Sequence, residues 1–257
     1  MKKLVFALPI MLLATAIQAQ TVGKKFQALA SVKSNTTVNQ MGTEMEIPSS
    51  GDIATDFEVK SLTGKTVTLT STLKRIAGAV TMMGNEQKFD SNDSATLNNP
   101  QLADALKELN KPGDITVEIG KAALYKDMSG LQNGEDVATY LFSPVDAATA
   151  KEGFAWSDSV SSAEGSKIVN KYTVSKVTKD EVTVIVISDN KTITTKQQNG
   201  MDLKVTMEGA LNSTRVYDAS NGILKNATTT FSANGNTEVQ GMTIPMTTKG
   251  SGTITIK

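Results

Sequence analysis

The chain contains no histidine and no cysteine among its 257 residues. It therefore lacks Ser-His-Asp and Cys-His nucleophilic machinery, thiol redox chemistry, disulfides, and the imidazole and thiolate ligands that zinc prefers. It also has no phosphate loop and no G-x-G-x-x-G dinucleotide fingerprint. The acidic residues are scattered over turns and polar strand positions, so spacing singles out no pair for carboxylate-based hydrolysis. We therefore expect a protein that is not an enzyme and needs no cofactor, with a histidine-free hydrolase as the residual alternative.

Aromatic residues and net charge are scarce as well. Phe, Trp and Tyr together make up 5% of the chain, and 26 basic residues balance 26 acidic ones. The few aromatics do not support a platform for stacking bases or sugars, and balanced charge gives no attraction to nucleic acid. Nucleic acid is therefore not an expected partner. The hydrophobic content of 39% is ordinary for a folded globular protein.

Residues 1–19 have the three parts of a secretory signal. Two lysines precede an apolar run, and small residues then lead to Ala19, after which a peptidase could cut. The run is too short for a transmembrane anchor, which needs about 20 apolar residues. No cysteine follows it to accept a lipid. We expect residues 20–257 to form a single mature domain, soluble in the periplasm or secreted.

Strand signals dominate the mature chain. Four segments alternate apolar and polar residues with period two, many of them with threonine at the polar positions; they are 66–70, 115–119, 203–207 and 253–256. This pattern is typical of antiparallel strands with one solvent-exposed face. The segment 182–187 is apolar on both faces in its second half, which predicts a strand under a covering layer. The expected fold is mainly β (α+β), a large curved antiparallel sheet or open half-barrel.

One short helix is expected to cover this sheet. Leu102, Leu106 and Leu109 have helical spacing, Pro100 suits the first turn, and Lys111-Pro112-Gly113 ends the segment. A weaker helical turn is predicted near 145–151. The Ser-, Gly- and Ala-rich segment 157–166 is predicted to be a loop.

A faint internal repeat suggests how the chain is organised. The segment 35–48 is echoed by 236–245, and 57–69 is echoed by 172–184. This predicts two related β halves, about 23–92 and 166–257, around a helix-containing insert at about 93–165. Because the matching hairpins stand at opposite ends of the chain, the first and last strands would meet in one sheet. The alternative is that threonine-rich strands resemble one another by composition alone.

Methionines recur in the echoed hairpins and in other predicted strands. Thioethers can ligate Cu(I), but copper would need convergence across strands, and methionine more often fills or lines adaptable apolar space. We therefore expect no metal site and prefer an apolar lining. The residues expected to line such a pocket are Met41, Met45, Met82, Leu102, Leu106, Phe142, Trp156, Met207, Met242 and Met246.

Several landmarks together resemble a known family. They are Asn99-Pro100 before the expected helix, the 115–119 strand, Phe142-Ser143-Pro144, Gly153-x-x-Trp156 and Asp218-x-x-x-Gly222. The pattern is similar to an uncharacterised family of exported bacterial proteins, classed as a domain of unknown function. The resemblance implies a β-rich periplasmic or outer-membrane-associated protein and supplies no catalytic residues. Members of that kind often carry a lipidation cysteine, which this chain lacks. A more remote, architectural similarity is to lipoprotein-carrier half-barrels, in which a curved sheet and covering helices hold acyl chains.

The functional hypothesis is an exported envelope protein that binds, without catalysis, a lipid or other apolar small molecule, or an envelope protein. The alternative is a structural or surface-assembly protein that pairs through its strand edges.

Overall fold

The computed structural model describes residues 22–40, 42–97, 106–121, 123, 134–198 and 201–257. The expected signal segment and most of the expected 100–110 helix lie outside these residues. The described strands are β1 (Lys25–Gln40), β2 (Thr43–Thr63), β3 (Thr66–Met82), β4 (Asn85–Asp90), β5 (Pro112–Glu118), β6 (Ala155–Ser161), β7 (Lys167–Val177), β8 (Glu181–Gln198), β9 (Met201–Asp218), β10 (Leu224–Val239) and β11 (Met242–Ile256). The described helices are α2 (Ser94–Leu97) and α4 (Gly134–Ala138).

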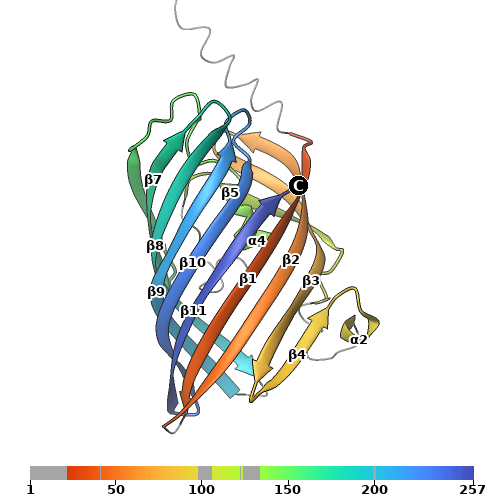
Figure 1. Cartoon of the computed structure of the whole chain (residues 1–257), viewed down its shortest axis with the longest axis vertical. Coiled ribbons are helices and arrows are strands. Elements are labelled where there is room, and N and C mark those ends of the chain that lie inside the picture. The colour runs from red at the N-terminus through yellow and green to blue at the C-terminus, as the bar shows by residue number, and fades with distance from the viewer. Residues whose placement is uncertain (1–21, 41, 98–105, 122, 124–133, 199–200) are drawn as a thin grey trace, which may run out of the picture.

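All these strands belong to one antiparallel sheet. Its order is β4-β3-β2-β1-β11-β10-β9-β8-β7-β6, and β5 pairs with the other end of β3. The sheet is strongly curved and open, and α4 lies within the curve (Figure 1). The expected mainly β fold with one large curved antiparallel sheet is confirmed. Among the described helices, none is long and apolar enough to cross a membrane.

The first and last strands meet in the middle of the sheet, as the arrangement of the echoed hairpins predicts. β1 pairs with β11 from Ala28 opposite Ile256 to Val38 opposite Met246. The β1–β2 and β10–β11 hairpins therefore lie side by side (Figure 1). The boundaries of the two proposed halves stay a prediction.

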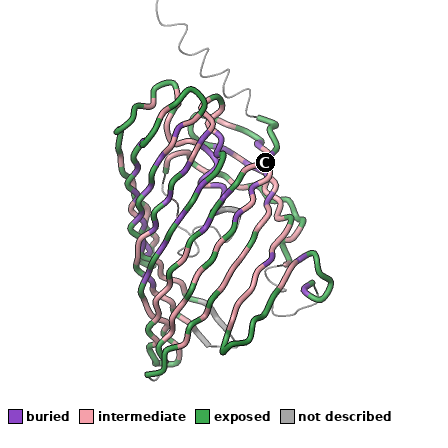
Figure 2. The backbone as a smooth tube through the Cα atoms, viewed as in Figure 1, coloured by how far each residue is buried: buried purple, intermediate pink, exposed green. Residues whose placement is uncertain are grey.

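Buried and exposed residues alternate along many of the strands (Figure 2). The buried ones lie on the inner face, on which α4 packs, and the exposed ones lie on the outer face. On β8 the inner residues Val182, Val184 and Val186 are buried, but Ile185 and Ile187 on the outer face are 37% and 44% exposed. The expected covering layer over 182–187 is therefore wrong at these positions, because the sheet is covered from the inner side. The predicted loop at 157–166 is wrong for Ser157–Ser161, which belong to β6. Serine there occupies the exposed positions of an alternating strand.

The core fills the end of the inner face that lies next to α4. Tyr140 and Leu141, just after the helix, are fully buried against inner-face residues such as Val67 and Leu69. The segment is held in place by backbone hydrogen bonds: the Leu224 N–H donates to the Leu141 carbonyl at 2.9 Å. This end of the sheet is thus closed by the chain itself.

Glycines on the inner face let neighbouring strands approach closely. A Cβ atom at Gly235 would collide with the Thr206 carbonyl oxygen and lie 2.7 Å from Met207 Sδ. A Cβ at Gly209 would lie 2.6 Å from the Cβ of Ala233. Side chains at these positions would force the strands apart, and glycines at such points are a device by which curved sheets bend.

Candidate ligand-binding site

A hollow lies on the inner face of β1 to β4; we call it the inner-face pocket. Its volume is about 310 Å³, at the lower end of the range for small-molecule sites. Its lining residues are Val32, Ser34, Ser49, Ser50, Gly51, Ile53, Ile76, Ala77, Val80 and Phe89. No ionisable side chain is among them, so the pocket suits an uncharged ligand.

The pocket exists because two glycines stand opposite each other. Gly51 on β2 pairs with Gly78 on β3, and Gly51 also pairs with Val32 on β1. The Phe89 ring lies over Gly78, where a Cβ would be 2.7 Å from its Cζ atom. A Cβ at Gly51 would meet no atom within 4 Å. The missing side chain of Gly51 therefore leaves open space beside a wall of half-buried aliphatic residues.

Two hydroxyl groups of the pocket are hydrogen-bonded to each other. Ser34 Oγ and Ser49 Oγ lie 2.7 Å apart and bond to each other. In such a pair one hydroxyl donates and the other accepts, so covering the pair with a hydrocarbon costs less desolvation free energy than covering two unbonded hydroxyls. The pocket therefore favours alkyl groups.

A second apolar group continues the inner face toward the hairpin tips. Met207, Leu211, Phe231 and Ala233 form a buried cluster, which we call the β9–β10 cluster. Val32, Val205 and Met246 pack against it. Since Val32 also lines the inner-face pocket, the cluster and the pocket adjoin.

The methionines of the two echoed hairpins fall on one line across the sheet. Val38 pairs with both Met45 and Met246, and Gly235 pairs with both Met246 and Met207. The line thus reads Met45, Val38, Met246, Gly235, Met207. Met207 is buried and the other two methionines are half-buried. Met207 belongs to the β9–β10 cluster and Met246 packs against it, and the Thr237 hydroxyl donates to Met246 Sδ at 3.5 Å.

Beyond the cluster, on β7 and β8, the inner face becomes polar. Ser188 Oγ donates to Asn170 Oδ1 at 2.6 Å, and Asn170 Nδ2 donates to the Tyr172 hydroxyl at 2.9 Å. All three side chains are buried. Asn190, the next inner residue after Ser188, is 5% exposed. Within the described part of the chain, neither its amide nitrogen nor its amide oxygen has a hydrogen-bond partner.

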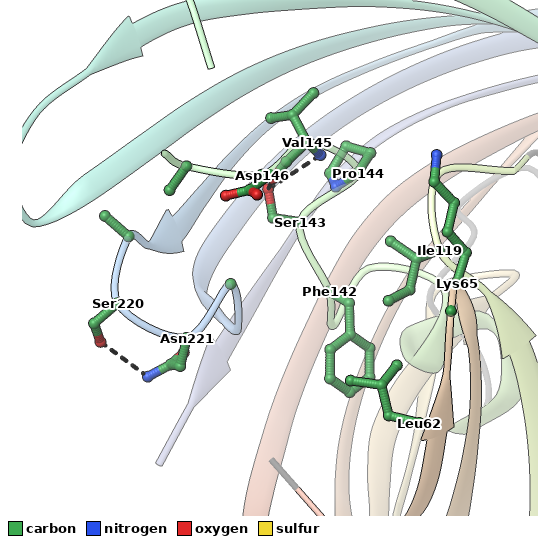
Figure 3. Close-up of a pocket in the computed structure, with 14 residues that line it drawn as sticks. Leu62, Lys65, Ile119, Phe142, Ser143, Pro144, Val145, Asp146, Ser220 and Asn221 are labelled. Carbon is green, nitrogen blue, oxygen red and sulfur yellow. Dashed lines mark hydrogen bonds between the residues drawn. The ribbon is translucent and has the colours of Figure 1, made fainter. Parts of the chain in front are cut away.

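A separate pocket of about 270 Å³ lies at the rim of the sheet near α4 (Figure 3). Phe142, Leu62 and Ile119 lie together in its wall. Its polar groups serve the local turns: Ser143 Oγ donates to the Val145 carbonyl at 2.8 Å, and Asn221 Oδ1 accepts from the Ile223 N–H at 2.9 Å. The rim pocket is smaller than the inner-face pocket, and charged Lys65 and Asp146 are part of its lining, so it suits an uncharged alkyl ligand less well.

One ion pair outside the inner face ties β3 to the end of β4. Arg75 Nη2 lies 2.6 Å from Asp90 Oδ2, and Arg75 Nε lies 3.1 Å from Asp90 Oδ1. These hydrogen bonds from Arg75, aided by the backbone N–H of Asn92, lower the pKa of Asp90 from 3.8 to about 2. The pair fixes the strand that carries Phe89, the end wall of the inner-face pocket.

The structure distributes the residues that the sequence singles out over several places. Phe142 lines the rim pocket, and Trp156 stacks on Tyr172 with ring centroids 4.7 Å apart. Met82 and Met242 are exposed, and Leu106 is half-buried. Met41 and Leu102 lie outside the described residues. Of the residues that were predicted to line a pocket, Met45, Met246 and Met207 lie in one line across the inner face.

Sequence reasoning missed the inner-face pocket and Asn190. The period-two pattern of β8 could have found Asn190, because it continues the inner series Val182, Val184, Val186 and Ser188. The pocket left a weaker signal. Gly51 and Gly78 are unremarkable in sequence, and only the register of β2 against β3 brings them together.

One segment of the chain matches a known family of proteins. Residues 136–224 match the profile of a family of unknown function, DUF6263. The expected resemblance to a family without assigned function is confirmed over this segment, which runs from α4 to the start of β10. No curated protein sequence matches the chain significantly.

Two solved structures show limited similarity. One, described as lipid–protein interactions in lipovitellin, is 11% identical with a TM-score of 0.49; the alignment covers 92% of this chain and 25% of that chain. The chain thus spans about a quarter of that protein. The other, an outer-membrane channel from Pseudomonas putida F1, is 10% identical with a TM-score of 0.28, and the alignment covers 94% of this chain and 98% of that chain.

Proposed function

We propose that the protein binds an uncharged ligand with an alkyl chain on the inner face of its sheet, without catalysis. The observation that carries this proposal is the inner-face pocket. It combines aliphatic walls, open space over Gly51, mutually bonded serines and no ionisable group in its lining. Burying half-exposed Val32, Ile53 and Ile76 under a ligand would gain roughly 25 cal/mol per Å² of apolar surface removed from water.

A small molecule fits this surface better than a protein partner does. The pocket lies within a concave face, and small-molecule sites are typically concave and mainly apolar. Pairing through strand edges has less support. Edge strand β4 carries exposed Glu86 and Lys88, and Asp158 on edge strand β6 pairs with the inner residue Asn170. Charges on edge strands and inward-pointing charges oppose pairing with other chains.

Native mass spectrometry tests the proposal. Protein purified from its own cells should carry one bound alkyl-chain molecule of a few hundred daltons. Delipidated protein should take up one equivalent of 1-monolauroylglycerol. If both preparations give only the mass of the bare chain, the proposal is wrong.

We further propose that the protein is exported and acts outside the cytoplasm. The support is the lysine start, short apolar run and small residues of the segment 1–19. N-terminal sequencing of the protein from the envelope fraction should begin at Gln20. A cytoplasmic protein that begins at Met1 would contradict export.

A further inference from the structure

Exposed methionines gather at the end of the sheet that lies away from α4. The hairpins that join β1 to β2, β3 to β4 and β10 to β11 all turn there (Figure 1), and we call it the hairpin-tip end. Met82 is 47% exposed, Met83 is 82% exposed and Met242 is 53% exposed. Single apolar side chains are ordinary on a protein surface, but several at one place indicate an interaction site.

Met83 holds a backbone conformation that methionine rarely adopts. It forms a two-residue turn with Gly84 between the paired residues Met82 and Asn85, and φ is 51° at Met83 and 78° at Gly84. Such a turn needs positive φ at both central residues, so asparagine or aspartate is favoured at the first of them. Methionine there costs folding free energy and also exposes a large apolar side chain to water. Stability of the fold does not explain this methionine, whereas contact with an apolar environment does.

The exposed methionines continue the wall of the inner-face pocket. Val80 lines the pocket, and Met82, two residues further along β3, lies on the same face of the regularly paired strand. On β2, Ile47 stands two residues beyond the lining residue Ser49 and is half-buried. Partly exposed apolar side chains therefore run from the pocket to the hairpin-tip end.

The charges at this end indicate which kind of apolar partner it suits. Lys88 Nζ lies 3.0 Å from Glu86 Oε2, and Lys204 Nζ lies 3.9 Å from Glu238 Oε2. Both basic side chains are thus paired with acids of the same end, and exposed Glu44 next to the β1–β2 turn adds a negative charge. Attraction to anionic lipids needs an excess of basic residues. The described residues of the hairpin-tip end offer none, so a surface without net charge is the better match.

We propose that the hairpin-tip end docks on a zwitterionic phospholipid surface, with Met82, Met83 and Met242 in the apolar layer beneath the head groups. This inference extends the proposed function, since docking places the inner-face pocket beside a lipid source of its alkyl ligand. A fluid surface suits these side chains because they stand on separate hairpins, and unbranched methionine adapts to irregular apolar surroundings. Binding at the boundary of head groups and acyl chains grows with the apolar area that is buried there.

Flotation with phosphatidylcholine vesicles tests the docking. Met83→Asn replaces the apolar side chain by one that favours positive φ. Gln240→Asn is the matched control, because Gln240 has a φ of 50° and precedes Gly241, with a φ of 79°, in the β10–β11 turn. Thermal unfolding without lipid measures the effect of each change on its turn. The apolar dye N-phenyl-1-naphthylamine, and 1-monolauroylglycerol that displaces it, measure ligand binding by delipidated protein in solution.

We expect the wild type to float with the vesicles and Met83→Asn to bind them about tenfold more weakly, because one exposed apolar side chain is lost. Gln240→Asn should bind them as the wild type does. Both variants should raise the Tm by about 2–4 °C, so that weaker binding by Met83→Asn is not a loss of fold. Anionic phosphatidylglycerol added to the vesicles should not strengthen binding.

The docking is wrong if the wild type does not float, or if Met83→Asn floats equally well. It is also wrong if binding needs anionic lipid, or if Met83→Asn lowers the Tm, which would show that this methionine serves the fold. Ligand binding in solution decides the proposed function separately. A wild type that floats but binds neither the dye nor 1-monolauroylglycerol would leave the docking standing and overturn the proposed function.

Discussion

The guanidinium carbon of Arg215 lies 3.9 Å from the centre of the Tyr140 ring. Both side chains are buried, at 5% and 0% exposure. Arg215 projects from the inner face of β9, and Tyr140 follows α4. The contact therefore joins the segment that closes one end of the inner face to the sheet, and both residues fall within the family-matched segment 136–224.

A double-mutant cycle should measure this contact. Buried cation–π pairs contribute up to about 2 kcal/mol, so Tyr140→Leu and Arg215→Met should show a coupling energy of about 1–2 kcal/mol in urea unfolding. Each substitution also changes other contacts, and the cycle separates those from the pair. Coupling below about 0.3 kcal/mol, the usual error of additivity, would mean that the two side chains merely lie close.

Gly235 should tolerate alanine poorly, while Gly51 should accept it. A Cβ at Gly235 collides with the Thr206 carbonyl oxygen, whereas a Cβ at Gly51 meets nothing within 4 Å. We expect Gly235→Ala to lower the free energy of unfolding by about 1–3 kcal/mol. Gly51→Ala should leave it unchanged or raise it by up to about 1 kcal/mol, because glycine costs entropy in a strand. Equal effects at both positions would contradict the close approach of β9 and β10.

The ionised carboxylate of Asp90 should contribute to the free energy of unfolding near neutral pH, and this contribution should be lost in acid. Its folded pKa of about 2 is below the ordinary value of 3.8, because Arg75 stabilises the carboxylate. The contribution is therefore full above about pH 4 and is lost as the pH falls through about 2. Urea unfolding of Asp90→Asn should show a shallower loss of stability between pH 4 and pH 2 than the wild type. Arg75→Met should remove the same slope; identical slopes in all three proteins would refute the assignment.

Asn190 and Asn170 should respond in opposite ways to leucine. Asn190→Leu removes an unbonded buried amide and should raise the free energy of unfolding without ligand by about 1–3 kcal/mol. Asn170→Leu removes the hydrogen bonds that join Asn170 to the Ser188 and Tyr172 hydroxyls and should lower it by a similar amount. Thermal unfolding of both variants checks the signs. Destabilisation by Asn190→Leu would show that its amide is satisfied in solution.

Much of the fold follows from the sequence, because alternation has a direct physical meaning. The period-two runs at 66–70 and 203–207 place one face of each strand inward, and the echoed hairpins predict that β1 meets β11. The covering layer predicted over 182–187 was wrong, because apolar Ile185 and Ile187 face solvent. Composition cannot tell a covered face from an exposed one.

Less of the candidate site could be predicted from the sequence, because the site depends on the register of the paired strands. Gly51 and Gly78 become a pocket only when β2 and β3 pair at those positions. Met45, Met246 and Met207 share a line because β1 and β10 stand between their strands. From the sequence, large side chains were predicted as the walls of a pocket. The hollow arises instead where side chains are missing.

A dye titration with the inner-face pocket filled tests whether the protein binds apolar ligands in this pocket. Gly51→Leu places a side chain in the open space above Gly51, and Gly113→Leu is the control, since a Cβ at exposed Gly113 on β5 also meets no atom within 4 Å. We expect Gly51→Leu to remain folded but to bind N-phenyl-1-naphthylamine at least about tenfold more weakly, equivalent to roughly 1.4 kcal/mol, while Gly113→Leu should bind like the wild type. Unchanged binding by folded Gly51→Leu would contradict ligand binding in this pocket.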